Sequence, residues 1–151
     1  MHMKRTIKRV STRKPNSLTT LHHVPLFAGC SKKELAWIAR DSDIVSFKAG
    51  RVLIEQGQPG REAFIITKGI AKVSRGGKTL AKVGAGEMVG ELALLDNGPR
   101  TASVVCETDV EAVVISQKHL HGVLHEVPSL ARKLLSTLAG RIRDLDKAVN
   151  V

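Results

Sequence analysis

The sequence has few aromatic residues and few cysteines. It contains no tyrosine, three phenylalanines and one tryptophan, and its two cysteines are Cys30 and Cys106. Two cysteines cannot build the disulfide framework of a small secreted domain. No apolar run approaches the ~20 residues that a membrane-spanning helix requires, and no apolar segment of signal-peptide length follows the basic N-terminus. We therefore expect a cytoplasmic protein whose thiols are reduced.

Acidic residues are absent from the first 33 positions, which hold eight of the 24 lysines and arginines. The rest of the chain carries 16 basic and 14 acidic residues, so most of the net charge of +10 lies near the N-terminus. Because residues 1–17 also lack apolar periodicity, we expect a basic disordered arm there and a single domain at 18–151. Such an arm suits nucleic acid or an anionic membrane. No aromatic residue precedes Phe27 to stack on a base, which disfavours the first of these partners.

The order of local patterns predicts a mainly β protein with flanking helices. Apolar residues from Leu18 indicate a short helical lead-in, and a capping box at Ser31 and Glu34 starts a further helix. Helical spacing returns at 116–126 and again from Pro128, where an apolar stripe runs along the last helix. Between the helices stand short β-rich segments separated by glycine turns, at 44–47, 52–54, 64–66, 70–73, 79–83, 103–106 and 110–115. This spacing is typical of an antiparallel β-roll, or jelly-roll barrel.

One stretch between two predicted strands, from Gly90 to Val104, is suited to hold an anion. Glycine at position 90 permits unusual backbone angles, and Glu91 to Leu95 is predicted to form a short helix. The first turn of a helix has free N–H groups and a dipole that favours negative charge. Arg100 can return across the intervening turn to the same anion, and its guanidinium makes paired contacts that lysine cannot copy.

Glu91 is the unexpected residue in this arrangement, since a carboxylate repels a phosphate. It therefore has another task, and a sugar hydroxyl is a natural donor to it. Ala102 is small and leaves space for a ligand, while Thr101 adds a hydroxyl. An anion clamp beside a hydroxyl acceptor describes a cyclised ribose phosphate.

Two motifs in the right order make the sequence resemble the cyclic-nucleotide-binding domain of bacterial catabolite-type regulators, kinase regulatory subunits and gated ion channels. The resemblance runs from about Leu26 to Asp144, and Ala63 departs from the larger apolar residue that is usual in the family. The matching segments are Val89–Leu94 and Arg100–Val104 in the phosphate-binding cassette, and Leu53–Gly60, Phe64–Ile66 and Gly69 upstream.

The resemblance implies a role for each matching position. Glu91 would bind the ribose 2′-hydroxyl, and Arg100 would pair with the cyclic phosphate. Thr101 stands where a hydroxyl can reach the phosphate or the amino group of a syn guanine, which permits cGMP without excluding cAMP. The implied ligand-binding set is Gly90, Glu91, Leu92, Ala93, Arg100, Thr101 and Ala102, in which Leu92, Ala93 and Ala102 act through backbone N–H groups.

The base would be enclosed by two further groups of residues. Met88 and Val89 are candidates for one wall of its pocket. The last helix closes over the base in the family, so Leu138, Arg141 and Ile142 are candidate lid residues, with Arg141 able to stack on the purine. The apolar stripe of that helix also fits a core face or a dimer seam.

Other chemistries have weaker support. His121 and His125 have the spacing of a helical metal site, but no acid or cysteine completes it, so we expect no metal and no cofactor. Ser103 lies in no nucleophile elbow, and the cysteines have no neighbouring histidine, so we expect no catalytic residues and no enzyme. Cys30 and Cys106 are interpreted as small buried residues.

The sequence thus predicts a stand-alone cyclic-nucleotide sensor that binds cAMP, with cGMP permitted, and moves its C-terminal helix when the ligand binds. Its output would pass to an unknown downstream protein partner. Two alternatives stay open: a scaffold or regulatory subunit with a vestigial pocket, and an adaptor that docks on nucleic acid or an anionic membrane through residues 1–17.

Overall fold

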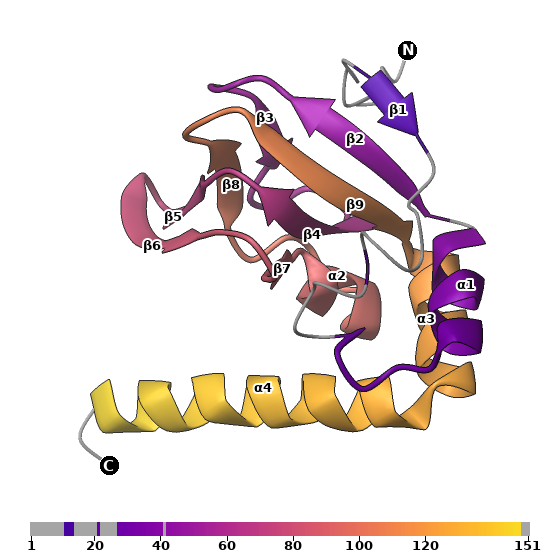
Figure 1. The fold of residues 1–151 in the computed structure, drawn as a ribbon. Helices are drawn as coiled ribbons and strands as arrows, with labels where there is room; N and C mark the ends of the chain where they lie inside the picture. The colour runs from indigo at the N-terminus through magenta and orange to yellow at the C-terminus, as the bar shows by residue number, and fades with distance from the viewer. Residues whose placement is uncertain (1–10, 14–20, 22–26, 41, 149–151) are drawn as a thin grey trace.

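A computed structural model describes residues 11–13, 21, 27–40 and 42–148. Two antiparallel sheets form a roll, with helices at one end and beneath it (Figure 1). The strands are β1 (Ser11–Arg13), β2 (Asp43–Phe47), β3 (Val52–Ile54), β4 (Glu62–Lys68), β5 (Ala71–Arg75), β6 (Lys78–Val83), β7 (Met88–Val89), β8 (Ser103–Cys106) and β9 (Val110–Ser116). The helices are α1 (Lys32–Arg40), α2 (Glu91–Asp96), α3 (Gln117–Glu126) and α4 (Pro128–Ala148).

The sheet topology confirms the predicted antiparallel β-roll. One sheet has five strands in the order β1-β2-β9-β4-β7, and the other has four in the order β3-β8-β5-β6. The short helix α2 lies between β7 and β8, and α3 and α4 follow β9, as the sequence predicted. The capping box is also present, because Ser31 and Glu34 exchange backbone-to-side-chain hydrogen bonds before α1.

The N-terminal arm differs from its prediction at three residues. Ser11–Arg13 form strand β1, which pairs antiparallel with β2 in the register Ser11–Ser46 to Arg13–Ile44. A sheet edge accepts any extended backbone, and this pairing requires no apolar pattern in the added strand. Apolar periodicity therefore could not reveal it. Most of the predicted lead-in between residues 18 and 27 lies outside the described residues, and the division at 17/18 stays a prediction.

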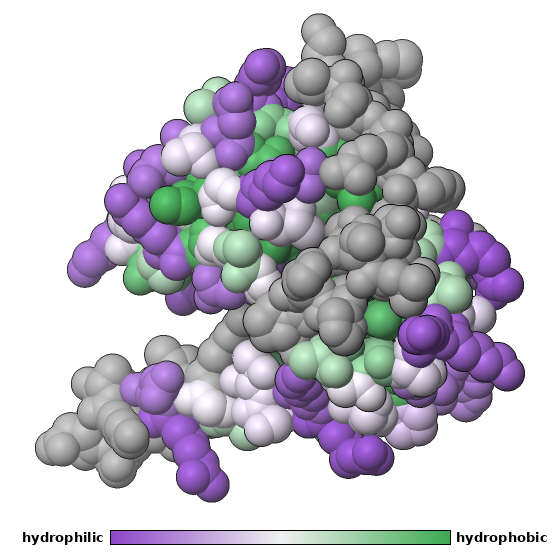
Figure 2. Space-filling view, viewed as in Figure 1, coloured by the Kyte–Doolittle hydropathy of each residue, from purple (hydrophilic) through white to green (hydrophobic). Residues whose placement is uncertain are grey.

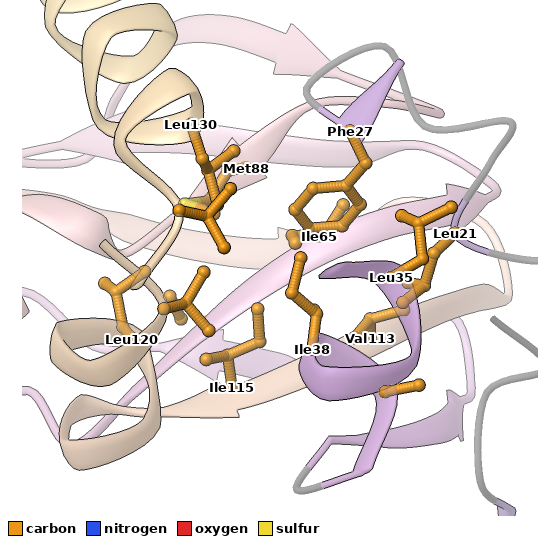
Figure 3. Close-up of a cluster of buried hydrophobic side chains, with 14 of the residues drawn as sticks. Leu21, Phe27, Leu35, Ile38, Ile65, Met88, Val113, Ile115, Leu120 and Leu130 are labelled. Atoms are coloured by element: carbon orange, nitrogen blue, oxygen red, sulfur yellow. The ribbon is translucent and has the colours of Figure 1, made fainter. Parts of the chain in front are cut away.

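Strand β4 separates two hydrophobic cores and is buried on both faces. Phe64 and Ile66 point into the core inside the roll, where the Phe64 ring meets Phe47 edge-on with 6.0 Å between centroids. Ala63 and Ile65 point the other way, into a core shared with α1, α3 and the start of α4 (Figure 3). Strand β4 thus connects the roll to the helices, and so does β9, whose Val113 and Ile115 lie in the helical core and whose Ala112 and Val114 lie in the roll core.

Helix α4 packs chiefly on α3 and then extends below the roll (Figure 1). Leu130 and Leu134 at its start are buried. Leu135 and Ile142 are 65% and 59% exposed, so the apolar stripe contributes to the core only in its first turns. No helix in the described part of the chain is long and apolar enough to cross a membrane.

The cysteines are free thiols with different surroundings. Cys106 is buried in the roll, and burial raises its pKa to about 11, so its thiol stays protonated at neutral pH. Cys30 is only half-buried, which differs from the expectation of a buried residue.

Gly69 and Gly50 offer a paired test of packing at the turns of the roll. Both have positive φ, +92° and +89°. A Cβ on Gly69 would lie 2.1 Å from the backbone oxygen of Asp109, whereas a Cβ on Gly50 meets nothing within 4 Å. We expect Gly50→Ala to cost about 1 kcal/mol of strain, and Gly69→Ala to cost about 3 kcal/mol or more. Urea unfolding measures both, and equal losses would contradict the clash.

Candidate functional site

Two loops that are distant in sequence form one site. The Gly57 amide donates to the carbonyl of Arg100 at 2.9 Å, and the Arg100 amide donates to the carbonyl of Gln58 at 2.8 Å. Pro59 and Pro99 form an isolated β-bridge between the same loops. The two sequence motifs therefore face each other across a cleft of about 230 Å³, which is lined by Gly57, Pro59, Gly60, Ala93, Asn97, Gly98 and Pro99.

The Arg100 side chain does not line this cleft but lies against Gly60, which does, and two backbone carbonyls hold it there. Its Nη1 donates to the carbonyl of Gly90 at 2.9 Å, and its Nη2 donates to the carbonyl of Glu62 at 2.6 Å. The residue is 8% exposed. Burial lowers the pKa of the guanidinium, and the carboxylates of Glu62 and Glu91 oppose that shift. The site thus maintains a buried cation in a defined orientation.

Glu91 is the first residue of α2 and is 3% exposed. Its carboxylate stabilises the charged form of Arg100, which places the acid and the cation in one electrostatic environment. The Oε2 atom of Glu91 is buried and accepts no hydrogen bond within the described part of the chain, although the residue has other interactions. The predicted acid and the predicted arginine therefore interact electrostatically, and their roles in binding a ligand stay predictions.

Gly90 leaves the start of α2 open. It has φ +87° and contributes no side-chain cap to the helix. The leading N–H groups of α2, including those of Leu92 and Ala93, therefore receive no side-chain acceptor from the capping position. Ala93 itself lies against the cleft and is buried.

Glycine at positions 60 and 90 makes room for the arginine. A Cβ on Gly90 would lie 2.7 Å from Nη1 of Arg100 and 2.9 Å from Cδ1 of Ile54. A Cβ on Gly60 would lie 2.6 Å from Cβ of Ala93 and 3.1 Å from Cζ of Arg100. Sequence analysis included Gly60 in a motif but did not assign it this contact, which depends on loops 40 residues apart.

Thr101 and Ala102 follow the arginine and are exposed and half-buried respectively. The Thr101 carbonyl accepts a hydrogen bond from Nε of Arg75 at 2.8 Å. This contact joins the β5–β6 hairpin to the cassette. The sequence provided no signal for it, because an exposed arginine beside a glycine pair is common in turns.

The predicted base wall is not confirmed by the packing. Met88 and Val89 form β7, and each is 7% exposed. Met88 packs in the helical core near Leu130 (Figure 3), and Val89 packs in the roll core. Both side chains are thus core residues, because β7 pairs with the doubly buried strand β4.

The candidate lid residues lie on α4, which packs chiefly on α3. Leu138 is half-buried and Ile142 is 59% exposed. Arg141 belongs to α4, but its side chain lies outside the described part of the structure. Closure of these residues over a base stays a prediction.

A polar link between α2 and α3 was not predicted. Gln117 Nε2 donates to the Leu94 carbonyl at 3.0 Å and to Oδ1 of Asn97 at 2.5 Å. His121 Nε2 lies 2.8 Å from the same Leu94 carbonyl. A carbonyl can only accept, so this nitrogen carries the proton. Within the described residues no three metal-ligating side chains gather, and His121 supports α2 instead.

Comparison with known proteins agrees with this geometry. The model of the family "cyclic nucleotide-binding domain" matches residues 44–126. A CRP-like cAMP-activated global transcriptional regulator of Mycobacterium tuberculosis is 32% identical over 78% of this chain and 55% of its own length. A cAMP-dependent protein kinase regulatory subunit of Hypocrea atroviridis is 29% identical, covering 75% of this chain and 24% of that protein.

A solved structure supports the same assignment. The catabolite activator protein of Thermus thermophilus superimposes with a TM-score of 0.77 at 30% identity, covering 83% of this chain and 62% of the other. The chain spans a little over half the length of the bacterial regulator that it matches in sequence. With the family model covering more than half of the chain, the protein belongs to the cyclic nucleotide-binding domain family.

Proposed function

We propose that this domain binds a cyclic nucleotide, cAMP with cGMP permitted, at the cleft beside Arg100 and serves a regulatory function without catalysis. The observation that carries the proposal is the buried Arg100 guanidinium, held beside Glu91 and the open start of α2. Family membership supports the ligand class, since relatives in the family are named as cAMP-activated or cAMP-dependent proteins.

The phosphate would be bound by the donors that remain on Arg100. A guanidinium has five N–H donors, and two of them serve the carbonyls of Gly90 and Glu62. These carbonyls orient the group and leave further donors for an anion. Backbone N–H groups of Leu92, Ala93 and Ala102 would add neutral hydrogen bonds to the same phosphate.

Glu91 would accept a hydrogen bond from the ribose 2′-hydroxyl. Its carboxylate is tolerated near a phosphate because the Arg100 cation lies in the same environment and offsets both charges. Glu91 and Arg100 are both buried, so water would screen their interactions with the ribose hydroxyl and the phosphate less than at the surface.

Ligand binding would reach α4 through α3. Movement of α2 toward the phosphate would displace the Leu94 carbonyl, to which Gln117 and His121 of α3 are bonded. Helix α4 packs on α3 and would then fold over the base with Leu138, Arg141 and Ile142. This is a shift between two states, and the ligand drives it only through its difference in affinity for them.

A regulatory subunit with a vestigial pocket is the second candidate, favoured by one observation. The cleft beside Arg100, of about 230 Å³, is smaller than the roughly 300–1,000 Å³ of most ligand pockets, and neither Arg100 nor Glu91 lines it. A functional site would therefore have to widen as α4 moves. In either case the output passes to a protein partner that the described residues do not identify.

Removing the guanidinium tests the first candidate. We expect Arg100→Ala to weaken cAMP binding by about 10- to 100-fold, because a charged hydrogen bond contributes roughly 1.5–3 kcal/mol. Arg100→Lys should lie in between, since it retains the charge but loses the fork. Calorimetry on the purified chain measures both, with the exposed Arg132 changed to alanine as control. Absence of binding by the parent chain would favour the vestigial pocket.

The hydroxyl of Thr101 tests base selection. It is exposed at the end of the cassette, where it could reach a guanine amino group. We expect Thr101→Ala to reduce cGMP affinity by about fivefold, in keeping with a neutral hydrogen bond of about 1 kcal/mol, and to reduce cAMP affinity less. Parallel calorimetric titrations compare the two nucleotides. Equal losses would show that Thr101 does not distinguish the bases.

Hydrogen exchange tests the movement of α4. Saturating cAMP should slow amide exchange along 135–144, since this exposed half of α4 would become covered. In a Gln117→Ala, His121→Ala variant, protection of the cassette should remain while protection of α4 decreases. A cassette that is protected with no change in α4 in the parent chain would contradict the proposed coupling.

A further inference from the structure

The β5–β6 hairpin concentrates positive charge on the body of the domain. No acidic residue occurs between Glu62 and Glu87, and five cations lie in that interval. Four of them belong to the hairpin: Lys72, Arg75, Lys78 and Lys82. Hydrophilic side chains alternate with apolar ones at the end of the molecule where Figure 1 places this hairpin (Figure 2). In the sequence this charge is separate from the excess in the first 33 residues.

The hairpin places like charges directly opposite each other. Lys72 pairs with Lys82, and Arg75 pairs with Lys78 across the Gly76-Gly77 turn. Side chains of directly opposed residues project to the same side, and like charges in such pairs are destabilising. Two such pairs lower the local stability of the hairpin. Residues that destabilise the structure around them are expected at functional positions.

Little within the domain neutralises these cations. Among the described residues, Lys82 is the hairpin cation that forms an ion pair, with Glu107 at 3.1 Å. The two side chains are 59% and 36% exposed, so the pair contributes little. Lys72 and Lys78 are exposed, and Nε of Arg75 is used by the Thr101 carbonyl.

The hairpin also presents an accessible backbone edge. Strand β6 is the last strand of its sheet, and Lys78 to Lys82 are exposed along its length. Every second residue of an edge strand directs its N–H and C=O groups outward, where another extended chain can pair with them. Lysines on an edge normally repel such pairing. For a strand that carries carboxylates, the same lysines become attractive, which makes the edge selective.

We propose that the β6 edge binds an extended acidic segment of a partner protein, which adds to the sheet as a strand and places carboxylates against Lys72 and Lys82 on one face of the hairpin and against Lys78 on the other. An edge that offers backbone hydrogen bonds fits a peptide. A nucleic acid is less suited to this edge, because Phe27, Phe47 and Phe64 are buried and Trp37 is half-buried, so no aromatic side chain of this chain is exposed for base stacking.

The tip of the hairpin connects this surface to the cassette. Arg75 bonds to the Thr101 carbonyl, and the Gly76 amide donates to Oε1 of Gln56 at 2.9 Å. The Gln56 amide in turn donates to Oγ of Ser103 at 2.9 Å, two residues after Thr101. The acidic segment would therefore bind beside the end of the cassette, on a hairpin fastened to it.

Fluorescence anisotropy of the full chain tests this surface. The probe is a labelled seven-residue peptide that alternates glutamate and valine, with a glutamine version as neutral control. The Lys72→Glu, Lys78→Glu double variant should lose at least tenfold in affinity for the acidic peptide. The matched control is Lys32→Glu, Lys33→Glu on α1, where both lysines are exposed and the net charge changes equally. It should change the affinity less than twofold.

Thermal unfolding separates lost binding from lost folding. The Lys72→Glu, Lys78→Glu variant turns both like-charge pairs into opposite-charge pairs, so its midpoint should rise by about 1 to 3 °C while binding falls. A lower midpoint would contradict the repulsion that we infer between the paired cations of the hairpin.

Two further probes test the mode of binding. N-methylation of the backbone amides of alternate residues keeps the charge of the peptide but removes its strand pairing. Two such peptides, methylated on odd or on even residues, cover the two registers. One of them should lose at least tenfold in affinity. The proposal would be overturned if both methylated peptides bound equally well. It would also be overturned if an oligo-dT strand bound more tightly than the acidic peptide and the Lys72→Glu, Lys78→Glu variant lost that binding. None of these readouts requires a cyclic nucleotide, so they are independent of the proposed function.

Discussion

The Arg100 guanidinium and the two carbonyls that hold it are the constraint on which the site depends. The contact brings together the loop before β4, the start of α2 and the loop before β8. A buried cation loses hydration, and the domain offsets this cost with two carbonyl hydrogen bonds and two nearby carboxylates. Gly60 and Gly90 are glycines because the guanidinium and Ala93 occupy the space that a side chain would need.

The β-roll fixes the position of the Arg100 guanidinium. Strand β4 is buried on both faces, so it couples the roll to the helical core and holds the Glu62 carbonyl at its first residue. Helix α2 follows β7, which pairs with β4, and α3 bonds to the end of α2. The cleft, the cassette helix and the C-terminal helices are therefore linked through β4 and its neighbour β9, whose residues also enter both cores. Such a chain of contacts is what a ligand-driven shift of α4 would use.

The positive charge of the protein has two locations with different consequences. The N-terminal excess is visible in the sequence as a run without acids. The positive charge of the hairpin is not visible in the total charge of the domain, because the residues beyond 33 are together near neutral. Pairing of β5 with β6 turns spaced lysines and an arginine into two opposed pairs, one on each face of the hairpin. The electrostatic character of this surface is thus a product of strand register.

The sequence by itself determined the strand-rich middle, the capping box, the short helix after Gly90 and the identity of the cassette, because turn glycines, periodicity and motif order are local properties. It did not reveal β1, whose pairing uses only backbone groups, nor the burial of Met88 and Val89, which depends on the neighbours of β7. The carbonyl partners of Arg100 and the bonds of Gln117 and His121 to Leu94 also required the structure. These contacts join residues that are 10 to 38 positions apart, and no local pattern specifies which distant backbone groups the folded chain will bring within hydrogen-bonding distance.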